Sequence, residues 1–130
     1  MNNEIAQIIE EEICSMSVDL NNKLSETTDI YFREERHLEE NRKEYIFELM
    51  VIEFENEDDY GPSLTIRLEK LNDYYELDLS VIRSYGSLLD RRLLKFTEQT
   101  VRDVSIHAAF FEMGSALLMA LEKLYLNRLR

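Results

Sequence analysis

The spacing of apolar residues near the N-terminus predicts an amphipathic helix over residues 3–25. Apolar side chains recur there at intervals of three and four, which places them in one sector of a helix: Ile5, Ile8, Ile9, Ile13, Met16, Leu20 and Leu24. Asn2 or Asn3 is a suitable N-cap, because an asparagine side chain accepts hydrogen bonds from the free amides of the first turn. Cys14 lies outside the apolar sector. We therefore expect one buried face on this helix and an outward-facing cysteine.

From residue 28 the hydrophobic period changes to two, which is typical of strands. Four segments show this pattern or are rich in strand-forming residues: 29–35, 43–55, 63–71 and 74–81. Asn72-Asp73 separates the last two and is a good hairpin turn, since both residues tolerate a positive φ. Segment 43–55 is apolar on both faces, which predicts a central strand covered on both sides. The pattern over 28–82 thus indicates a three- to four-stranded antiparallel meander.

After residue 86 the pattern favours helices again. Ser87 is a plausible cap for a helix over the segment SLLDRRLLKF, and apolar residues are dense from Val101 onward. The apolar face of this last segment rotates near Met113-Gly114, which predicts either a kink there or burial on several sides. The predicted fold is a single α+β domain over residues 1–130. It has an N-terminal helix, the meander, and two C-terminal helices, the last one kinked, packed on the sheet.

The C-terminal segment carries more apolar side chains than one sheet face requires. Four of them are candidates for a homodimer contact or a partner groove: Leu117, Leu121, Leu124 and Tyr125. The alternative is burial between the sheet and the neighbouring helices of the same chain. The sequence favours neither interpretation.

The formal net charge of −12 is distributed unevenly along the chain. Residues 1–65 contain 18 acidic and 5 basic residues, whereas residues 66–130 contain 9 acidic and 10 basic residues. A negative field disfavours nucleic acids and anionic membranes, because their binding requires lysine and arginine. It favours a basic protein partner, although solubility alone also explains acidic composition. The lone Cys14, the lack of a basic leader and the short apolar runs lead us to expect a cytoplasmic protein.

The sharpest local feature is the acidic stretch EFENEDDYGP, residues 53–62, which ends on the only proline in the chain. Its order of carboxylates does not match a calcium-binding loop, because they precede the glycine and no glutamate follows it. Two interpretations remain, a solvated hairpin turn and a docking patch for a basic partner. The candidate partner-binding residues are Glu53, Glu55, Glu57, Asp58, Asp59 and Tyr60.

No residue pattern predicts a catalytic or metal site. Glu34-x-x-His37 has the spacing of a di-iron ligand pair on a helix, but no second such pair exists. His107 lies four residues after Asp103 and is a candidate general base, although helical pairs of this spacing are mostly structural. We therefore predict no catalytic residue, no metal and no cofactor.

These observations favour a non-enzymatic protein-binding module that engages a basic partner protein. Its order of elements and its acidic surface resemble, in general terms, small bacterial immunity and antitoxin-type proteins, which implies an inhibitor of a basic protein. Two alternatives remain open. One is an enzymatic or small-molecule-binding domain with a pocket between sheet and C-terminal helices, using His107, Tyr74 or Tyr75. The other is a structural homodimer subunit.

Overall fold

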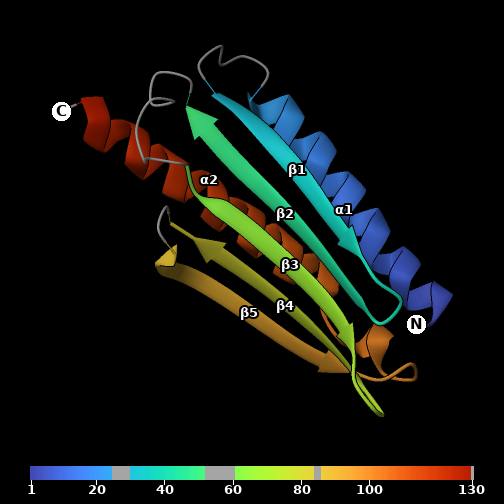
Figure 1. Cartoon of the computed structure of the whole chain (residues 1–130). Helices are drawn as coiled ribbons and strands as arrows, with labels where there is room; N and C mark the ends of the chain where they lie inside the picture. The colour runs from blue at the N-terminus through green and yellow to red at the C-terminus, as the bar shows by residue number, and fades with distance from the viewer. Residues whose placement is uncertain (25–29, 52–60, 84–85, 130) are drawn as a thin grey trace.

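The protein is a five-stranded antiparallel sheet with two helices packed on one of its faces (Figure 1). The computed structural model describes residues 1–24, 30–51, 61–83 and 86–129. In chain order its elements are α1 (Asn3–Leu24), β1 (Ile30–Leu38), β2 (Arg42–Val51), β3 (Ser63–Lys70), β4 (Tyr75–Ile82), β5 (Leu88–Phe96), a short 3₁₀ helix (Val101–Asp103) and α2 (Ile106–Leu129).

Helix α1 confirms the N-terminal prediction. Its buried side chains are Ile5, Ile9, Ile13, Met16 and Leu20. The Asn2 side-chain oxygen accepts hydrogen bonds from the amides of Glu4, at 2.8 Å, and Ile5, at 3.3 Å, so Asn2 is the N-cap. Cys14 is exposed, as its position on the helix predicted.

The four predicted strands are confirmed as β1 to β4, and the sheet order follows the chain order. The alternation of β3 sets the register, since Leu64, Ile66 and Leu68 are all fully buried. At the predicted Asn72-Asp73 turn, the amide of Leu71 donates to the carbonyl of Tyr74 over 2.9 Å. Each strand thus pairs antiparallel with the next one along the chain.

The predicted helix over SLLDRRLLKF is wrong, because residues 88–96 form a fifth strand. β5 pairs antiparallel with β4, and Arg91 lies opposite Ser80. Leucine, arginine and lysine are good helix formers, but helix propensity amounts to a few tenths of a kcal/mol per residue. The unpaired backbone of β4 offers a full ladder of hydrogen bonds along one edge. Pairing with that edge overrides the local preference.

A single helix, α2, follows β5, so the prediction of two C-terminal helices is also wrong for the described residues. The helix continues through Met113 and Gly114 without a break. Val101 belongs to the 3₁₀ helix and Val104 precedes α2, so including both in a helical pattern produced the apparent rotation of the apolar face. The buried residues of α2 form one stripe with helical spacing: Ile106, Ala109, Phe110, Met113, Leu117 and Leu121.

One hydrophobic core lies between the two helices and the sheet. In β2, Tyr45, Phe47 and Leu49 are buried in this core, whereas Ile46 lies on the opposite face and is half-buried. The expectation that this strand is covered on both sides is therefore wrong for its described part. In the described part of the chain no helix covers the face of the sheet that carries Ile46, and we call it the open face.

No helix among the described residues is both long enough and apolar enough to cross a membrane.

Candidate functional site

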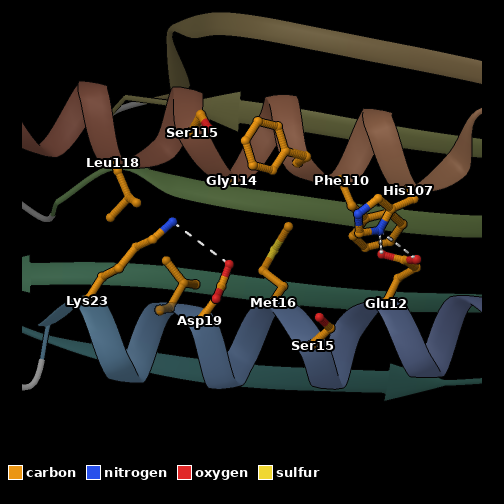
Figure 2. A pocket seen from close by; sticks show the side chains of 12 residues that line it. Glu12, Ser15, Met16, Asp19, Lys23, His107, Phe110, Gly114, Ser115 and Leu118 are labelled. Carbon is orange, nitrogen blue, oxygen red and sulfur yellow. Dashed lines mark hydrogen bonds and ion pairs between the residues drawn. The ribbon is translucent and has the colours of Figure 1, made fainter.

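A groove runs between α1 and α2 on the helical side of the molecule (Figure 2). Its floor is apolar, because Met16 and Phe110 are buried beneath it. Its rim carries polar side chains from both helices, among them Glu12, Asp19 and Lys23. The enclosed volume is about 50 Å³, far below the roughly 300–1,000 Å³ of ordinary small-molecule pockets. A groove of this shape suits a protruding side chain of a partner better than a whole metabolite.

Gly114 contributes to the shape of this groove. A Cβ atom added at position 114 would lie 3.4 Å from the terminal methyl of Met16 on α1. A side chain larger than a methyl at this position would therefore displace Met16. A small residue at position 114 thus suits the close approach of the two helices above the core.

We expect Gly114→Ala to raise the free energy of unfolding by about 0.5–1 kcal/mol, since alanine is the better helix former. The added methyl meets Met16 at ordinary contact distance and fills part of the groove. Urea denaturation of both proteins measures the change. Gly114→Leu serves as the contrast, because its larger side chain must displace Met16 and is expected to destabilise the protein. A loss of stability in the alanine variant would contradict this account of the groove.

His107 and Glu12 join the two helices at one end of the groove. The Nδ1 atom of His107 lies 3.0 and 3.1 Å from the two carboxylate oxygens of Glu12. The His107 side chain is 78 % exposed, whereas that of Glu12 is 20 % exposed. The carboxylate thus holds the imidazole from the protein side while the rest of the ring faces solvent (Figure 2). The sequence suggested Asp103 as the partner, but the two bonded residues are 95 positions apart and no local pattern connects them.

The chemistry of this pair is that of an oriented imidazole without an adjacent nucleophile. A histidine that activates a serine, threonine or cysteine nucleophile as its general base lies within hydrogen-bonding distance of that hydroxyl or thiol. Within the described residues, no hydroxyl or thiol is hydrogen-bonded to His107, although Ser15 and Ser115 line the same groove. The pair therefore acts as a polar link between α1 and α2.

The residues of the sequence's di-iron pattern do not converge. Glu34 and His37 are three positions apart on a strand, so they project from opposite faces of β1. Glu34 accepts hydrogen bonds from Arg36 and Ser17, whereas His37 lies 3.6 Å from Glu35. No cluster of three or more metal-ligating side chains occurs among the residues that the structure describes.

The residues of the enzymatic alternative are also separated. The Tyr75 side chain is buried, and its hydroxyl oxygen lies 3.2 Å from the Asn2 amide and 3.3 Å from Glu98. Tyr74 lies at the β3–β4 turn, where the Lys95 ammonium stands 5.8 Å from its ring centre. His107 bonds to α1 instead. The three side chains thus contact different partners and do not form a common pocket.

The candidate partner-binding residues of the acidic stretch, Glu53 to Tyr60, lie outside the described residues. Leu117 and Leu121 are buried in the core, at 0 % and 4 % exposure. Their position matches the alternative of burial within the chain. Leu124 and Tyr125 belong to α2, and their side chains lie outside the described part of the structure.

The charge asymmetry of the sequence is also an asymmetry in space. Because the sheet order follows the chain order, α1, β1 and β2 lie together at one side of the molecule (Figure 1). We call these three elements and the turn between β1 and β2 the acidic side. Its described residues include eleven acidic and five basic side chains, whereas residues 61–129 have nine of each where described. Among the described residues, the excess of negative charge therefore lies on this side.

Part of the negative charge on the acidic side is compensated by basic and hydroxyl groups of the same side. Glu10 on α1 pairs with Arg36 on β1 and accepts a hydrogen bond from the Tyr45 hydroxyl on β2. Burial raises the pKa of Tyr45, and the neighbouring Glu10 raises it further. This cluster anchors α1 to the sheet. Among the described residues, no basic side chain pairs with Glu11, Glu39 or Glu40, so these exposed carboxylates carry the free charge.

A second polar cluster, which no sequence pattern indicated, lies on the open face of the sheet. Asp78 on β4 is only 8 % exposed although it lies on this face. Its carboxylate accepts hydrogen bonds from Arg91 at 2.7 and 3.0 Å, from Ser80 at 3.1 Å and from Arg67 at 3.3 Å. These contacts join β3, β4 and β5. No local sequence pattern reveals this cluster, because two of the three partners of Asp78 come from other strands.

Comparisons with known proteins found no matching family model, no similar curated protein and no similar solved structure.

Proposed function

We propose that this protein is a non-enzymatic binding module whose acidic side engages a basic partner protein, in the manner of an immunity- or antitoxin-type inhibitor. The observation that carries the proposal is the segregation of charge across the sheet. Opposite charge on a partner would accelerate the encounter and select against acidic competitors. The groove between α1 and α2 borders this side and offers an apolar floor for an anchoring side chain.

The shape of the groove between α1 and α2 also favours a protein ligand over a small one. The groove is shallow, and His107 is occupied by Glu12. Phe111, on the outer side of α2, lines the same groove and is 65 % exposed. Aromatic side chains such as this one are enriched at protein interfaces, where they bury a large apolar area. The enzymatic alternative has less support, since its candidate residues are apart.

Reversing charge on the acidic side is expected to weaken partner binding by about tenfold, with a steep dependence on salt. The test variant combines Glu11→Lys and Glu40→Lys, both at exposed carboxylates that form no ion pair in the described part of the chain. Affinity capture at low salt supplies the basic partner, and calorimetric titration measures its affinity.

The matched control is Glu122→Lys, which reverses an exposed helical glutamate on α2. This variant is expected to bind the captured partner as the unmodified protein does. Two results would contradict the proposal: equal losses in the control and the test variant, or an affinity unchanged between low and physiological salt.

A further inference from the structure

The outer edge of β5 is exposed and apolar. Among the described residues β5 pairs with β4 alone, and Figure 1 shows it at the rim of the sheet. Leu88, Leu89 and Leu93 on this strand are 57 %, 47 % and 41 % exposed. An edge strand offers unpaired amide and carbonyl groups to another strand. The exposed leucines add apolar area that pairing would remove from water.

The sequence of β5 is suited to pairing with itself. Residues 88–94 read LLDRRLL, in which two leucines stand at each end of a charged centre at Arg91. In an antiparallel pair the two chains run in opposite directions, so positions equally far before and after the centre face each other. Pairing two copies about Arg91 therefore sets Asp90 of one copy opposite Arg92 of the other, twice by symmetry.

Arg91 would face the same residue of the second copy, yet its charge is already compensated. Its guanidinium forms a two-point hydrogen bond with Asp78 of the same chain, at 2.7 and 3.0 Å. Each copy thus brings its own counter-ion to the centre of the contact. The two Arg91 side chains are the one like-charge pair in this arrangement, and the Asp78 carboxylate of each chain reduces the repulsion between them.

We propose that two copies of this chain associate through β5, paired antiparallel about Arg91, and form one continuous sheet across the dimer. The regular part of the strand supports this register. The β4–β5 ladder is irregular at one end, because Val81 pairs with Asp90 whereas the next residue, Ile82, pairs with Leu88. Regular pairing therefore extends from Asp90 onward. Both Asp90–Arg92 pairs fall within this regular part.

Self-pairing fits the strand better than other occupants do. A uniformly acidic strand would face Asp90 with a like charge, and a uniformly basic strand would face Arg92 with one. A second copy matches both residues at once. The contact is also closed, since the two-fold symmetry uses both β5 edges and leaves neither free for further pairing. It places the acidic sides at the two far ends of the joined sheet, so this inference does not depend on the proposed function.

Sedimentation equilibrium of the full chain over a wide concentration range tests the proposal. The mass is expected to rise from 15.5 kDa towards twice that value. Arg92→Asp and Asp90→Arg should each weaken association on the order of tenfold, because each sets like charges opposite one another at two places. The double variant with both changes exchanges the charges and should restore the association of the unmodified protein.

Further variants separate the interface from the fold. Leu93→Thr removes apolar area while keeping a strand-forming residue and should also weaken association, whereas Leu38→Thr, at a 55 % exposed leucine of β1, should not. Glu112→Gln controls for the loss of the Arg92–Glu112 pair, 3.4 Å in this chain, and should leave the mass unchanged. Circular dichroism verifies the fold of each variant. A monomer at every concentration, or a double variant no better than the single ones, would overturn the proposal.

Discussion

Replacing Leu117 by alanine is expected to lower the free energy of unfolding by about 3 kcal/mol, the largest effect predicted for this protein. Leu117 is 0 % exposed and lies in the middle of the buried stripe of α2. Truncation removes its apolar contacts and leaves a cavity that the sheet and α1 cannot fill without strain. Urea denaturation monitored by circular dichroism measures the difference.

Met119→Ala is the matched control, because Met119 lies two positions further along α2 and is 57 % exposed. Its effect should be within about 0.5 kcal/mol. The comparison also discriminates between the two interpretations of the C-terminal leucines. If Leu117→Ala left stability unchanged and altered only the oligomeric mass, Leu117 would be a dimer contact and its placement in the core would be refuted.

Replacing Asp78 by asparagine is expected to cost about 2 kcal/mol at neutral pH. The change keeps the size of the side chain but removes the charge that Arg67 and Arg91 share. Asp78 is nearly buried, so the lost interactions are poorly replaced by water. Asp73→Asn, at an exposed turn position, is the control and should change stability by less than about 0.5 kcal/mol.

The cost of Asp78→Asn should depend on pH with a definite sign. The hydrogen bond from Arg91 lowers the pKa of Asp78 below its ordinary value of 3.8, burial opposes this shift, and the hydrogen bond from the Ser80 hydroxyl lowers the pKa further. A carboxyl with a lowered native pKa stabilises the fold above its unfolded pKa, near 3.8, and loses this contribution as the pH falls through the native value. The gap between wild type and variant should therefore be constant at neutral pH and shrink in acid. A gap that stayed the same in strong acid would show that Asp78 does not act through its charge.

The polar cluster around Asp78 also bears on the β5 edge. The Asp78–Arg91 contact is a side-chain link between β4 and β5. Loss of the charge on Asp78 should loosen β5 as well as expose an uncompensated Arg91. Stability and self-association are consequently coupled at this residue.

Much of the fold was predictable, because the residue patterns that specify α1, β3 and the turn between β3 and β4 are local. The stripe of isoleucines in α1 has helical spacing, and the alternation of Leu64, Ile66 and Leu68 in β3 has strand spacing. The cap at Asn2 and the turn at Asn72-Asp73 depend on neighbouring residues only. Each of these predictions was confirmed.

The candidate site was not predictable to the same degree. His107 was recognised as notable, yet its partner Glu12 comes from a helix at the other end of the chain. Asp78 reads as an ordinary polar position of an alternating strand, and its burial arises from arginines on two neighbouring strands. The acidic patch of Glu53 to Tyr60 lies outside the described residues, so its role as a docking surface stays a prediction.

By itself, the sequence determined the class of the fold, the N-terminal helix, four of the strands and the unequal distribution of charge. These features depend on periodicity and composition, which can be recognised within each segment of the sequence separately. Tertiary structure decided that LLDRRLLKF is a strand, because the open edge of β4 outweighs a small helical preference. It also decided that Leu117 is buried and that the charge split along the chain becomes an acidic side, because a meander keeps neighbours in sequence as neighbours in space.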